Sequence, residues 1–138
     1  MSPFDIIFVL PTPLRITPEN TQDPVLSLMR KSPFQSLKAF VRLFHRVSRD
    51  LKRPVELRPY LIVGDPGATL GDVQEMAGRL KPLSLAATDV QIFTPTPGTL
   101  ATAMYYAEMT PDRRTTPVEK RISALVGRKA LLTGGQTG

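Results

Sequence analysis

The feature that most constrains the fold is a near-continuous apolar run, Tyr60-Leu61-Ile62-Val63, inside residues 57–64. Runs of this kind are typical of a strand in a parallel sheet, where helices cover both faces. The run ends at Gly64-Asp65-Pro66-Gly67, whose residue types favour a tight turn. We therefore predict a parallel strand over residues 57–64 that is buried on both sides.

An amphipathic helix is predicted before this strand, over residues 33–51. Ser32 is the expected N-cap, Pro33 suits the first helical position, and Gln35 completes a capping box. The apolar side chains recur at helical spacing on one stripe, at Phe34, Leu37, Phe40, Val41, Phe44 and Val47. The basic residues lie mostly off the stripe, and we expect His45 to be a surface histidine.

A second helix is predicted after the turn, over residues 70–81. Thr69 can cap it, and Asp72 stands at the third position, where a carboxylate favours the helix N-terminus. Its apolar residues follow the i, i+3, i+4, i+7 spacing, at Val73, Met76, Ala77 and Leu80.

Shorter elements complete the predicted order. We expect strands over residues 5–10, 14–17 and 89–94, a helical turn near 25–30, a turn at 104–106, and a last helix over 117–127. Alternating strands and helices indicate an α/β fold, either a partial (β/α) barrel or a small open parallel sheet with flanking helices. We assign this region to residues 1–106 and an irregular C-terminal extension with one helix to 107–138.

Composition excludes several chemistries. The chain has no Cys and one His, so disulfides, zinc-finger spacings, thiolate nucleophiles and cysteine-ligated clusters are excluded for these residues. The longest apolar run, residues 6–10, is too short to cross a bilayer. We expect a cytoplasmic protein without membrane contact.

The net charge of +6 is concentrated. Between Arg30 and Arg58 there are nine Lys or Arg against Asp50 and Glu56. A basic surface can bind nucleic acid, but few aromatic side chains interleave with these charges. We therefore favour a solvated helix face over a nucleic-acid site.

Three loops follow predicted strands, over residues 17–21, 64–69 and 94–99. In parallel α/β proteins, ligands bind where strands end and helices begin. If the strands lie side by side, these loops line one rim of the sheet. Taken singly, each loop is explained by turn and cap chemistry, and the second one lacks the Lys-Ser/Thr of a phosphate loop.

Taken together, the loops resemble YgiQ-type radical S-adenosylmethionine (SAM) proteins. Residues 14–21 (LRITPENT) are similar to "LKIAPEHT", and residues 59–69 (PYLIVGDPGAT) to "PYFIAAHPGTT". Residues 90–99 (VQIFTPTPGT) are similar to "VQNFYPSPxxT", followed by Thr-Ala-Met-Tyr-Tyr like "TxMYYTG". The resemblance covers about residues 14–134 and matches the C-terminal portion of that family.

The resemblance implies the later strands of a radical SAM barrel. In that family a CxxxCxxC loop holds a 4Fe-4S cluster that binds SAM; this chain has no cysteine to do so. The loops would lie around SAM or the substrate, with these candidate contacts: Glu19, Thr21, Asp65, Gly67, Thr69, Gln91 and Pro97. Asn20 and Asp65 replace the two histidines of the family motifs.

Three functions remain open from the sequence. The first is a truncated or split radical SAM-like protein that is not catalytic alone and depends on a cluster-bearing polypeptide or a second copy. The second is a nucleotide- or SAM-binding module. The third is a basic nucleic-acid-binding protein, which the sparse aromatic residues disfavour.

Overall fold

The computed structural model describes residues 13–134 and contains a three-stranded sheet in the order β1-β2-β3. The strands are β1 (Leu14–Glu19), β2 (Leu57–Val63) and β3 (Asp89–Ile92), and both neighbouring pairs are parallel. The helices are α2 (Asp23–Leu28), α3 (Phe34–Asp50), α4 (Leu70–Leu80), the short 3₁₀ helix η1 (Lys81–Leu83), α5 (Leu100–Ala107) and α6 (Ile122–Thr133). The predicted small open parallel sheet with flanking helices is confirmed.

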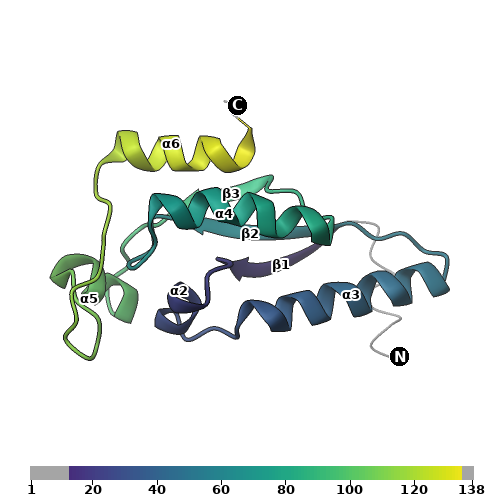
Figure 1. The fold of residues 1–138 in the computed structure, drawn as a ribbon, viewed down its shortest axis with the longest axis horizontal. Coiled ribbons are helices and arrows are strands. Elements are labelled where there is room, and N and C mark those ends of the chain that lie inside the picture. The colour runs from purple at the N-terminus through teal and green to yellow at the C-terminus, as the bar shows by residue number, and fades with distance from the viewer. Residues whose placement is uncertain (1–12, 135–138) are drawn as a thin grey trace.

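Helices α3, α4 and α6 pack against one face of the sheet. In Figure 1, α3 runs beside β1, at one end of the strand order, and α6 lies near β3 and α4, at the other end. The hydrophobic core lies between these helices and the sheet. Both contribute side chains to it, including Val41, Phe44, Leu61, Met76, Val90 and Leu132. The apolar stripes of the helices therefore determine which sheet face is buried.

The other face of the sheet is open in residues 13–134. Along β2 the residues facing the helices are buried, while Arg58 is exposed and Tyr60 and Ile62 are half-buried. The prediction of a strand covered on both faces is therefore wrong for this part of the chain. On the open face, Arg15 pairs with Asp89 at 2.8 Å and its guanidinium lies 4.7 Å from the centroid of the Tyr60 ring.

The start of α3 differs from the prediction. Pro33 is the N-cap, and Ser32 and Gln35 form no capping box. Instead, Asp23 at the start of α2 accepts a hydrogen bond from the Phe34 N–H at 2.8 Å. A carboxylate from a neighbouring helix thus accepts the hydrogen bond of a first-turn N–H, for which the sequence predicted a local side-chain cap. By contrast, Thr69 and Asp72 form the predicted capping box of α4.

The C-terminal elements also depart from expectation. The predicted turn at 104–106 is part of α5, which Thr99 caps through the Thr102 N–H. The last helix starts at Ile122 rather than Pro117 and continues through Gly127 to Thr133. Residues 116–121 form neither helix nor strand, and Arg121, the N-cap of α6, has an extended backbone. The predicted strand over residues 5–10 lies outside the described residues.

Two further strand boundaries differ slightly. β1 continues past Pro18 to Glu19, and its pairing with β2 shifts register between Ile16 and Glu19. A proline at such an irregularity costs no ladder hydrogen bond. The third strand ends at Ile92, two residues before the predicted end, although the Phe93 N–H still donates to the Val63 carbonyl at 2.9 Å.

No helix among residues 13–134 combines the length and the apolar character needed to cross a membrane. The longest, α3, has 17 residues and carries a row of basic side chains. His45 on this helix is exposed, as predicted.

Truncation of Leu61, which is 0% exposed at the centre of β2, should destabilise the fold strongly. We expect Leu61→Ala to lower the free energy of unfolding by about 2–5 kcal/mol, because it leaves a cavity in the core. Leu43→Ala, at a position 53% exposed on α3, should change it by no more than about 0.5 kcal/mol. Urea unfolding of the three proteins measures both values, and equal effects would contradict this assignment of the core.

Candidate functional site

The carboxyl ends of β1 and β2 bring two of the three predicted loops together. Asn20, Thr21 and Asp65 are each 2% exposed or less. Parallel pairing of β1 with β2 places both strand ends at one edge of the sheet. The result is a small buried polar cluster, which we call the rim cluster: Asn20, Thr21 and Asp65.

Asn20 organises the first loop. Its side-chain oxygen accepts hydrogen bonds from the Thr21 N–H at 2.8 Å and the Gln22 N–H at 3.0 Å. Because the oxygen is occupied by these two donors, the side-chain amide nitrogen remains to donate to the Asp65 carboxyl group. Asn20 therefore links the loop after β1 to the loop after β2.

Asp65 is a buried acid. Burial raises its pKa from 3.8 to about 7; the Asn20 hydrogen bond opposes this shift, and the nearby negative charge of Glu19 adds to it. Lys31, which pairs with Glu19 at 3.2 Å, lowers the pKa slightly. The acid is therefore partly protonated at neutral pH.

Two oxygens of the rim cluster have no hydrogen-bond partner among the described residues, Asp65 Oδ2 and Thr21 Oγ1. Unpaired buried polar atoms are costly and uncommon in folded proteins. The rim cluster thus retains unused hydrogen-bonding capacity beneath the edge of the sheet.

The glycines of the second loop are required by geometry. Gly64 and Gly67 have φ angles of +87° and +92°, which residues with a Cβ rarely adopt. A Cβ on Gly67 would lie 2.7 Å from a methyl carbon of Leu28. The Gly67 N–H donates to the Pro117 carbonyl at 2.8 Å, so it already has a partner. Gly67 therefore allows close packing here and has no free amide for an anion.

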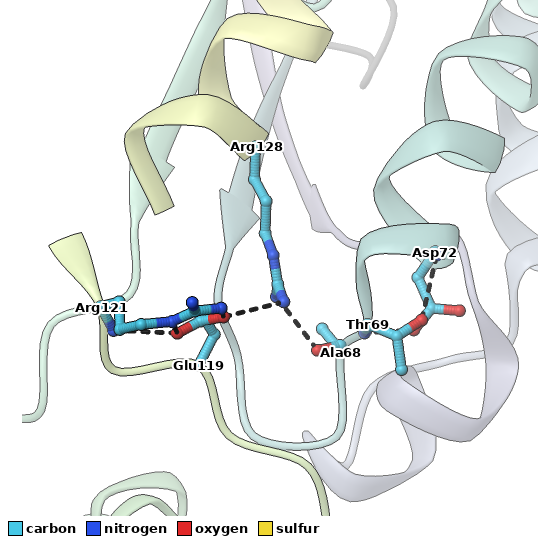
Figure 2. A network of polar contacts seen from close by, with 6 residues as sticks. All are labelled: Ala68, Thr69, Asp72, Glu119, Arg121 and Arg128. Carbon is cyan, nitrogen blue, oxygen red and sulfur yellow. Dashed lines mark hydrogen bonds and ion pairs between the residues drawn. The ribbon is translucent and has the colours of Figure 1, made fainter. Parts of the chain in front are cut away.

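A strap formed by residues 115–121 holds the second loop from outside (Figure 2). Arg128 on α6, whose side chain is 11% exposed, donates to the Ala68 carbonyl at 3.3 Å and lies 3.7 Å from Glu119. Hydrogen bonds from Arg121 lower the pKa of Glu119 to about 2, so Glu119 is ionised at neutral pH. The loop that carries Asp65 is thereby tied to both the strap and α6.

The predicted site residues divide into two groups. Glu19, Thr21, Asp65 and Gly67 lie in the two loops that meet at the rim cluster. Thr69 ends the second loop and caps α4, whereas Gln91 is exposed on the open sheet face beside Ile62 and Pro97 is exposed in the loop before α5.

The structure adds Asn20, Glu119 and Arg128 as residues that shape the site. In the sequence, Asn20 differs from the family motif, and an Asn that bonds the backbone two residues on is also a recognised turn signal. Arg128 has no local signal, because it is 60 residues from the carbonyl that it binds.

Curated relatives match most of the described region. A UPF0313 protein of Porphyromonas gingivalis is 43% identical over 93 residues, which are 67% of this chain and 15% of the relative. One from Geobacter sulfurreducens is 43% identical over 98 residues, and one from Thermotoga petrophila is 36% identical over 108 residues. These stretches are 71% and 78% of this chain and 16% and 19% of the relatives. No protein-family model matches the chain.

The chain is homologous to UPF0313 proteins. The loop motifs predicted a relationship to YgiQ-type proteins, and the sequence similarity to UPF0313 proteins confirms this family relationship. The chain spans less than a fifth of the length of the three relatives, with shares between 15% and 19%.

An iron–sulfur cluster does not fit the residues of this chain. The chain contains no Cys, and thiolates are the ligands that such clusters require. Within residues 13–134, no three His, Asp or Glu side chains gather closely enough to hold a metal ion.

Replacement of Asp65 should change the pH dependence of stability. Between pH 4 and 7 the unfolded state releases a proton that folded Asp65 retains, so the free energy of unfolding falls as the pH rises. Asp65→Asn removes this dependence. Relative to the parent, the variant should gain roughly 2–4 kcal/mol between pH 4 and pH 7 in urea unfolding. A constant difference across this range would contradict a raised pKa.

Loss of the Arg128 contacts should loosen the second loop. We expect Arg128→Gln to speed hydrogen exchange of the Gly67 N–H about 3- to 30-fold, because the strap that accepts this hydrogen bond is less firmly held. Arg121→Gln is the matched control, since Arg121 is 78% exposed and contacts Glu119 alone among the described side chains. Equal acceleration in both variants would show that Glu119, rather than Arg128, holds the strap.

Proposed function

We propose that this segment forms the nucleoside-binding edge of a radical SAM-like UPF0313 protein, and that cluster ligation is supplied by residues outside these 138. The observation that carries the proposal is the rim cluster, where two loops with motif resemblance to that family meet around a buried acid with an unpaired oxygen. In such a protein the bound cofactors supply the chemistry and the polypeptide positions them.

Glu19 is the residue best suited to contact the ligand. It ends β1 with a φ of +64°, and its side chain is 21% exposed, so part of the carboxylate reaches the surface. Carboxylates at this edge of α/β sheets accept hydrogen bonds from ribose hydroxyls. Lys31 holds Glu19 in place, and Asp65 supports the same loop from below through Asn20.

The remaining predicted residues have less direct roles in this proposal. Thr69 and Gly67 shape the second loop, because the Thr69 side chain and the Gly67 N–H are already hydrogen-bonded within the protein. Gln91 is exposed on the open sheet face and is free to approach a ligand that lies across that face. A cluster-bearing polypeptide, or a second copy, would cover this face.

Binding of SAM tests the proposal. Calorimetric titration of the chain with SAM should show saturable binding, and Glu19→Gln should weaken it about 5- to 10-fold by removing a charged acceptor. Glu56→Gln is the matched control, because Glu56 precedes β2 at the opposite edge of the sheet. The absence of heat at millimolar SAM, or equal weakening by both variants, would overturn the assignment of the edge.

The cluster part of the proposal has its own measurement. Anaerobic treatment of the purified chain with iron and sulfide should leave no bound cluster in its absorption spectrum. A stable brown protein after desalting would contradict the proposed division of roles, whatever the result of the SAM titration.

A further inference from the structure

Helix α3 and the segment after it carry positive charge that the described residues do not neutralise. Ion pairs elsewhere join cations to carboxylates on the strands, α4 and the strap. Within residues 13–134, no carboxylate lies within ion-pair distance of the basic side chains of this region. The residues concerned are Lys38, Arg42, Arg46, Arg49, Lys52 and Arg53.

Part of this charge faces a groove of about 550 Å³ between α3 and the end of α4. Its basic lining residues are Lys38, Arg42, His45 and Arg79. Its apolar lining includes Phe34, Val41, Gly78, Pro82 and Leu83. No Asp or Glu lines it, but Glu75 lies 3.8 Å from the guanidinium of Arg79, so among residues 13–134 the unpaired positive charge of the groove comes from Lys38 and Arg42.

Contacts within the protein hold two of the basic groups at the groove. Arg79 donates to the Thr21 carbonyl at 3.0 Å, and its guanidinium lies 5.5 Å from the centroid of the Phe34 ring. His45 Nε2 lies 3.3 Å from the Leu83 carbonyl oxygen, which can only accept, so Nε2 carries the hydrogen. These side chains are therefore oriented before any ligand arrives.

We propose that the α3–α4 groove binds a compact organic phosphate, with the phosphate among Lys38, Arg42 and Arg79 and the organic part on the Phe34 side. Arginine is suited to phosphate because its donors can bind two oxygens at once. The volume of about 550 Å³ is within the range of small-molecule sites, and the apolar floor favours a ligand with an organic body.

The groove has different lining residues from the nucleoside edge proposed above, but one hydrogen bond connects the two. Arg79 binds the carbonyl of Thr21, a member of the rim cluster, so a phosphate that engages Arg79 affects the loop after β1. A second hollow, of about 350 Å³, shares His45 and is lined by Arg49, Lys52 and Arg53. A long polyanion would use both hollows, whereas a compact phosphate needs only the first.

Titration with inorganic pyrophosphate, followed by amide shifts in NMR spectra, tests the proposal. We expect saturable shifts in residues around the groove and a 5- to 10-fold weaker affinity in Arg42→Gln. Arg46→Gln is the matched control, because Arg46 is exposed on the same helix and removes the same charge without lining either hollow. Its affinity should stay within about twofold of the parent, since long-range charge effects are screened by salt.

Three outcomes would overturn the compact site. Shifts that do not saturate, or equal weakening by Arg42→Gln and Arg46→Gln, would indicate general charge attraction. A polyanion surface would give a different result. Affinity would depend as strongly on Arg49 and Lys52 as on Arg42, and it would increase steeply with the length of an oligonucleotide probe. Failure of SAM binding leaves these results unaffected, because the probe contains no nucleoside.

Discussion

The parallel pairing of β2 with β1 and β3 is the constraint on which the rest of the structure depends. Leu61 and Val63 are fully buried between the helices, and the strand pairs on both sides. Because all three strands point the same way, their following loops emerge at one edge. The rim cluster exists only because this pairing brings Asn20 and Asp65, which are 45 residues apart in sequence, into contact.

Burial of Asp65 has consequences for the whole second loop. An acid taken out of water is unfavourable when charged, so it needs supporting donors and a rigid surrounding loop. Asn20 supplies one donor, and Arg128 with the strap supplies the rigidity from the opposite side. In the same chain, the absence of Cys means that these 138 residues offer no thiolate ligand to a cluster.

Charge divides the molecule into two surfaces of different character. On the strap, arginines meet glutamate and carbonyl partners and stabilise a loop. On α3, basic side chains have no acidic partners among the described residues and surround a groove. Unpaired cations gathered on one helix create a local positive potential. Arg79 connects the groove to the rim cluster, because it contacts both Phe34 and Thr21.

The sequence by itself determined the elements with strong local signals. The apolar run in β2, the Thr69–Asp72 cap of α4 and the stripe of α3 follow from side-chain periodicity and local hydrogen bonding, which need no distant partner. The family relationship also came from ordered loop motifs. Only the tertiary structure decided that Asp23 caps α3, that residues 117–121 are not helical, and that Asn20 and Arg128 support the loops of the rim cluster. Each of these depends on a partner far away in the chain, and a distant contact leaves no periodic trace in the residues that make it.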